Sequence, residues 1–134
     1  RPPPAPRRSR AAAAAAPCAD GCDSTTAHLS SYLCELTLQE YGFLKYRPSE
    51  IAAAAMCLAL HTMRLPSWTP LLEQVSGYTA DDLTGCVAEM HAVFRKAESN
   101  SLQAVREKYS HAKFLCVSTL QPPDTLPPGA ERQA

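Results

Sequence analysis

The chain has 134 residues, 46% of them hydrophobic, which is enough for one domain with a modest core. Its 13 basic and 13 acidic residues give a formal net charge of +0 at pH 7. The chain as a whole therefore has no charge bias toward nucleic acid or anionic lipid. No run of about 18 apolar residues occurs, which argues against a transmembrane helix, and we expect no membrane partner.

Residues 1–24 form a low-complexity leader in which prolines and arginines surround a run of alanines. No apolar periodicity appears there, so we expect a disordered segment or at most a weak alanine helix. The arginines of the leader are Arg1, Arg7, Arg8 and Arg10. They could make weak, salt-sensitive contact with nucleic acid. The rest of the chain shows no aromatic platform or basic helix face, so specific nucleic-acid binding is not expected.

A first helix is predicted over about residues 28–41. The hydroxyl residues before it are suited to capping an N-terminus, and Gly42 could close its C-terminus in the left-handed conformation. Its apolar stripe is Leu29, Tyr32, Leu33 and Leu36, and its capping residues are Ser24, Thr25 and Thr26.

The second predicted helix, at about residues 48–63, is the most informative segment. Pro48 suits a first helical turn, and Glu50 is favourable at the positive end of the helix dipole. Between Ile51 and Leu60 no side chain is polar. A helix that is apolar on every side must be covered on every side, and this one is too short to span a bilayer. The segment is therefore predicted to be the central helix of a helical domain.

Three more helices are predicted after the central one. A short helix should begin at Thr69-Pro70 and stop at Gly77. The next should begin with a capping box at Thr79 and Asp82. Its apolar face is Leu83, Val87, Met90, Phe94 and Ala97. The last, at about residues 102–109, should turn Leu102, Val105 and Tyr109 inward. No strand pattern competes, so the predicted fold class is all-α, and the proline-rich residues 119–134 are predicted to be a disordered tail.

Catalytic and metal chemistry find little support in the sequence. Cys18 and Cys22, followed by His28 and Cys34, make one loose pair rather than the two tight pairs of a zinc site. The histidines His28, His61, His91 and His111 are scattered, and Glu107 with His111 forms only an ordinary helical surface pair. Cys57 should be buried with an inert thiol. We therefore expect no enzyme, no cofactor, no metal and no small-molecule substrate.

Several segments, in order, resemble the C-terminal cyclin box of mitotic cyclins of the A or B type, with the B type preferred. They are Tyr32-Leu33-Cys34-Glu35-Leu36-Thr37-Leu38, Lys45-Tyr46-Arg47-Pro48-Ser49-Glu50-Ile51, Trp68-Thr69-Pro70, Gly77-Tyr78-Thr79, Asp82-Leu83, Leu102 to Ser110 and Lys113-Phe114. The resemblance implies a cyclin C-terminal domain at residues 25–118, with five helices packed around a central third helix at about 48–63.

The same resemblance implies a regulatory, non-catalytic subunit that binds and activates a cyclin-dependent protein kinase in the cell cycle, in the nucleus and cytoplasm. The family's N-terminal cyclin box, which holds most of the kinase contacts, is expected to be absent from this chain, so the kinase-binding residues stay unknown. The first helix of the box is expected to be degraded, because Arg7-Arg8-Ser9-Arg10 leads into alanines. The alternative is a cyclin-like scaffold or transcription-factor-type module with weak nucleic-acid contact through the leader.

Overall fold

The computed structural model describes residues 24–128, and within them the fold is all-helical, as predicted. Five α-helices, α2 to α6, are joined by four short 3₁₀ helices, η1 to η4. None of the described helices is long and apolar enough to cross a membrane. The leader, apart from Ser24, and the expected remnant of the first cyclin-box helix fall outside the described residues.

Helix α2 spans Ser24–Thr37 and so begins and ends about four residues earlier than predicted. The predicted stripe from Leu29 to Leu36 is buried, as expected. The expected capping role of Thr26 is wrong, because this residue lies inside the helix and is fully buried. Gly42 does not close the helix either, since it lies within η1 (Tyr41–Lys45) and does not have a positive φ.

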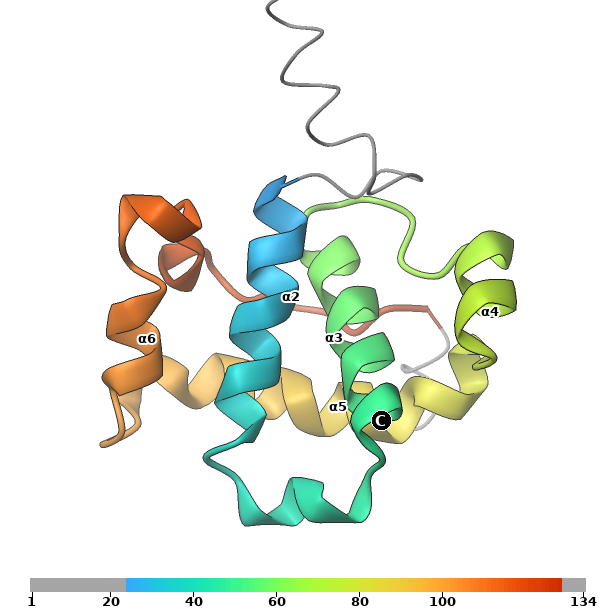
Figure 1. Cartoon of the computed structure of the whole chain (residues 1–134), viewed down its shortest axis with the longest axis horizontal. Coiled ribbons are helices and arrows are strands. Elements are labelled where there is room, and N and C mark those ends of the chain that lie inside the picture. Colours follow the sequence, from blue (N-terminus) through green and yellow to red (C-terminus); the bar gives the residue numbers. More distant parts are fainter. Residues whose placement is uncertain (1–23, 129–134) are drawn as a thin grey trace, which may run out of the picture.

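Helix α3, Pro48–Thr62, is the central helix that the sequence predicted. It runs beside α2 in the opposite direction, and α5 crosses both (Figure 1). Most of its length is buried, including three successive alanines and, at 0% exposure, Leu58. The cover is incomplete along one line, where Ala52 is exposed and Met56 is half-buried.

Helices α4 (Pro70–Ser76) and α5 (Ala80–Lys96) begin as predicted. The Thr79 hydroxyl accepts a hydrogen bond from the Asp82 amide at 3.1 Å, and the Asp82 carboxylate accepts one from the Thr79 amide at 2.9 Å. This reciprocal pair satisfies backbone donors that would otherwise lack partners at the helix start. Gly77 closes α4 with a φ of 82°. The predicted inner face of α5, from Leu83 to Ala97, is buried.

Helix α6, Ala104–Lys108, is shorter than predicted. Val105 packs against the core and Tyr109 is 3% exposed, so both face inward as expected. The inward placement of Leu102 is wrong, because this side chain is 55% exposed. Its amide donates to the Asn100 side chain at 2.8 Å, which holds it in the turn before the helix.

The remaining 3₁₀ helices are η2 (Ala97–Ser99), η3 (Ala112–Phe114) and η4 (Val117–Thr119). The sequence predicts a disordered tail from residue 119. The structure shows instead that residues after η4 pack against the domain. Leu120 and Leu126 pack against the core, and Pro127 is fully buried. An irregular segment packed in this way has no helical or strand periodicity, so the sequence pattern could not distinguish it from disorder.

Candidate interaction surface

Of the four residues considered for metal binding, the structure describes His28 and Cys34. In residues 24–128, no three or more His, Cys, Asp and Glu side chains are grouped so that they could hold a metal ion. His28 lies edge-on to the Phe114 ring, with 5.7 Å between centroids, and Cys34 is half-buried on α2. Cys18 and Cys22 lie outside the described residues.

The side chains considered for catalysis have structural partners instead. Burial raises the pKa of the Cys57 thiol to about 12, so the thiol stays protonated and unreactive. His91 is buried, with its Nε2 2.7 Å from the carbonyl oxygen of Pro123. The Nε2 of His61 lies 3.0 Å from the carbonyl oxygen of Thr125. Both histidines therefore hold the C-terminal segment rather than a reacting group.

The most distinctive surface is a group of exposed apolar side chains at η1, which we call the η1 patch: Leu38, Tyr41 and Leu44. Their exposed fractions are 83%, 86% and 74%. Tyr41 and Leu44 are three apart within η1 and so share one face of this 3₁₀ helix, and Leu38, in the turn before η1, lines the same hollow as they do. Large apolar side chains grouped on a surface mark sites of protein contact. The η1 patch is therefore the candidate interaction surface of the described domain.

A shallow hollow of about 180 Å³ lies at this patch. Its apolar walls are Leu38, Tyr41, Phe43, Leu44 and Ile51, and its polar edge is Thr37 and Glu40. The hollow is open to solvent and lies where the end of α2, η1 and the start of α3 meet. An apolar side chain of a partner could enter it and cover the patch at the same time.

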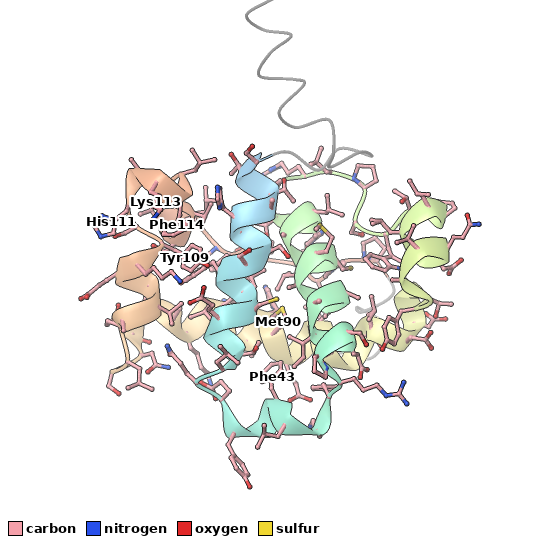
Figure 2. The ribbon with its side chains drawn as sticks, in the orientation of Figure 1. Phe43, Met90, Tyr109, His111, Lys113 and Phe114 are labelled. Carbon is pink, nitrogen blue, oxygen red and sulfur yellow. The ribbon has the colours of Figure 1, made fainter. Side chains whose placement is uncertain are left out.

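The η1 patch is held in place by the opposite face of η1. Phe43, labelled in Figure 2, is 5% exposed and packs against the Tyr46 ring at 5.7 Å. The Tyr46 hydroxyl donates to the Glu89 carboxylate on α5 at 2.5 Å, and the Lys45 ammonium lies 2.9 Å from the same oxygen. These contacts fix η1 against α5, so the patch is presented on a supported segment.

The electrostatics of this anchor favour a charged Glu89 and a neutral Tyr46. Burial alone would raise the pKa of the Glu89 carboxyl, but the hydrogen bonds from Tyr46 and Lys45 outweigh it and lower that pKa. Burial, and then the Glu89 carboxylate, raise the pKa of Tyr46 above its ordinary value. The Tyr46 hydroxyl therefore stays a donor throughout the neutral range.

A second anchor of the same chemistry fixes α6 against α2. Tyr109 donates to the Glu35 carboxylate at 2.5 Å, and Lys108 lies 2.9 Å from it. Tyr109 also packs against Phe114 at 4.7 Å, and Figure 2 shows both rings on the α6 side of the domain. In each anchor, neighbouring Lys and Tyr residues hold one Glu of a long helix, so this pairing belongs to the architecture rather than to a reaction.

Sequence reasoning did not find the η1 patch. The sequence pattern places Leu38 and Tyr41 in the last turn of a helix that extends to residue 41, whereas α2 ends at Thr37. The available signal was the three-residue spacing of Tyr41 and Leu44 around Gly42, which fits a 3₁₀ helix.

Comparisons with known proteins identify the domain. The family described as Cyclin, C-terminal domain, matches residues 7–123. Human cyclin-A1 (Homo sapiens) is 42% identical over 102 residues, which cover 75% of this chain and 22% of that protein. G2/mitotic-specific cyclin-A of Hydra viridissima is 44% identical over 101 residues, covering 75% of this chain and 24% of that protein. G2/mitotic-specific cyclin-B3 of Gallus gallus is 42% identical over 101 residues, covering 75% of this chain and 25% of that protein.

The chain thus spans about a quarter of the length of these relatives. A-type and B-type cyclins match at nearly equal identity, so the preference for the B type stays a prediction. The alternative of a cyclin-like scaffold or transcription-factor-type module is not favoured by relatives with these names. The match over residues 7–123, together with the all-helical fold around α3, shows that the chain belongs to the family of cyclin C-terminal domains, within the A- and B-type mitotic cyclins.

Proposed function

We propose that this chain is the regulatory, non-catalytic C-terminal domain of a cell-cycle cyclin and that it acts in a complex with a cyclin-dependent protein kinase. The observation that carries the proposal is the family match over residues 7–123, with relatives named as mitotic cyclins. The partner is a protein rather than a small-molecule substrate, nucleic acid or membrane, and the site of action is the nucleus and cytoplasm.

In this proposal the η1 patch contributes a protein contact within the cyclin–kinase complex. Fully burying one leucine-sized side chain is worth about 1.5–3 kcal/mol. Leu38, Tyr41 and Leu44 leave more apolar surface exposed than Phe43 does, and a partner can bury this surface. Because Phe43 and Tyr46 hold η1 against the domain, a partner would meet a segment that is already ordered. Little conformational entropy would then be lost on binding.

A domain replacement tests the function. Residues 7–123 would replace the matching segment of human cyclin-A1, and the chimaera would be mixed with a purified cyclin-dependent kinase. We expect it to bind the kinase and activate phosphorylation of a protein substrate to within a few-fold of unmodified cyclin-A1. A folded chimaera that neither binds nor activates any cyclin-dependent kinase would reject the proposal.

A matched pair of leucines tests the patch. Leu44→Ser removes an apolar side chain from the η1 patch, whereas Leu71→Ser removes an exposed one from α4. If the patch is a contact of the complex, Leu44→Ser should weaken kinase binding about tenfold or more, and Leu71→Ser should leave it unchanged. Equal effects of the two changes in a binding titration would show that the patch has no special role.

Localisation needs a separate measurement. A fluorescent fusion of the chimaera should distribute between nucleus and cytoplasm in dividing cells. Confinement to any other compartment would contradict this part of the proposal.

A further inference from the structure

Residues 120–127, which we call the strap, cross the domain as a segment without helix that bends at Asp124 and Thr125. The strap passes behind α2 and α3, from the α6 side of the domain toward α4 (Figure 1). Pro122, Pro123 and Pro127 fix φ and lack the backbone donor that a helix needs, which explains why the chain forms no helix here. The strap is thus a peptide-like segment lying on a surface built by other elements.

Two histidines hold the strap by its backbone. On α5, His91 Nε2 lies 2.7 Å from the Pro123 carbonyl oxygen. At the end of α3, His61 Nε2 lies 3.0 Å from the Thr125 carbonyl oxygen and 3.2 Å from the hydroxyl of that residue. A carbonyl oxygen can only accept, so each ring donates. The two carbonyls belong to residues on either side of Asp124, where the strap bends, so the two rings hold the strap on both sides of this residue.

Apolar contacts complete the attachment. Leu126 packs against the core and Pro127 is fully buried, whereas Asp124 and Pro128 are exposed. Hydrogen bonds to the peptide backbone and pockets for its apolar side chains are two means by which proteins recognise peptides. The surface under the strap has both parts of such a site.

We propose that this surface, formed by His61, His91 and the apolar surface beneath Leu126 and Pro127, is a binding site for a peptide of the pattern Pro-Pro-x-x-Leu-Pro, bound without helix and with the bend that the strap has at Asp124 and Thr125. In the intact chain the strap occupies the site in cis, and the same sequence supplied in trans can replace it. This site is distinct from the η1 patch, and its occupation does not depend on a kinase.

The tether determines how well a free peptide can compete with the strap. A segment tethered close to its site has an effective concentration on the order of millimolar, so a free peptide competes poorly with the intact strap. Cutting the tether removes that advantage. The prolines restrict the backbone of the free peptide, so it loses less conformational entropy on binding than a peptide without them.

The test uses the whole chain with a site-specific protease sequence inserted after Gln121. After folding, the chain is cut, and the released C-terminal fragment is removed by dialysis. Binding of a fluorescein-labelled peptide of residues 121–128 is then followed by fluorescence anisotropy. We expect saturable binding to the cut chain and binding at least tenfold weaker to the uncut chain.

Matched variants define the site. In the peptide, Pro127→Ala should weaken binding several-fold, whereas Pro128→Ala, a change at the exposed neighbour, should not. In the chain, His91→Phe removes one donor and should weaken binding about threefold to tenfold, while His91→Gln keeps a donor and should recover part of the loss. Circular dichroism of each variant verifies that the helices are intact.

Three outcomes would overturn the proposal. The first is a cut chain that loses its helical circular dichroism on dialysis. The second is a folded cut chain that binds no labelled peptide. The third is equal binding of the native and Pro127→Ala peptides, which would show that the buried proline is not recognised.

Discussion

The central place of α3 can be tested with a single buried leucine. Leu58 is 0% exposed in the middle of α3, where that helix packs against α2 and α5. Leu58→Ala removes most of the side chain and leaves a cavity, which typically costs about 2–5 kcal/mol. The whole domain is expected to be stable by only about 5–15 kcal/mol. At about 4–8 °C per kcal/mol for a domain of this size, a loss of about 3 kcal/mol would lower the Tm by about 12–24 °C.

Leu44→Ala is the matched control, because it makes the same chemical change at a side chain that is 74% exposed. Its free energy of unfolding should stay within about 0.5 kcal/mol of the parent. Urea unfolding can be followed through the single Trp68, which donates to the Tyr78 carbonyl at 2.9 Å and is half-buried in the fold. A loss below about 1 kcal/mol for Leu58→Ala, or equal losses for both variants, would refute the central-helix reasoning.

Three further predictions concern the cap, one carboxylate and one thiol. Thr79→Ala removes the hydroxyl that accepts from the Asp82 amide and should cost about 1 kcal/mol in urea unfolding; an unchanged midpoint would count against the capping box. Burial opposes ionisation of Glu35, but the Tyr109 hydrogen bond and Lys108 lower its pKa in the folded state. Its stabilising contribution is therefore complete above the ordinary value near 4.5 and is lost as pH falls through the lower folded value. Glu35→Gln should reduce the loss of folding stability at acid pH, and an equal loss in the variant would contradict the assignment. Iodoacetamide at pH 8, with sites mapped by mass spectrometry, should leave Cys57 unmodified until urea unfolds the chain; rapid native labelling would show that the thiol is accessible.

The sequence predicted best where local chemistry and tertiary packing require the same residue. Pro48 begins α3, Thr79 and Asp82 form the capping box, and Gly77 closes α4 at a positive φ. Each of these signals acts through backbone groups within a few residues, so it does not depend on what packs nearby. The apolar run of α3 was equally informative, because it is too rich in apolar side chains to be stable without cover.

Prediction was weaker where long-range contacts decided the outcome. Thr26 was read as a cap because hydroxyl side chains suit that role, yet packing buries it inside α2. Leu102 was read as an inner residue from its spacing, yet the turn held by Asn100 turns it outward. In both cases the local pattern fits two placements, and contacts with distant residues select one of them.

The sequence by itself determined the all-helical class, the central position of Pro48–Thr62 and, through its ordered motifs, the cyclin family. Only the tertiary structure decided that the η1 patch remains uncovered and that the proline-rich strap is ordered. The physical reason is the range of the interactions. Caps and helical periodicity are encoded within a few residues, whereas the order of the strap depends on His61 and His91, which lie far from it in the sequence.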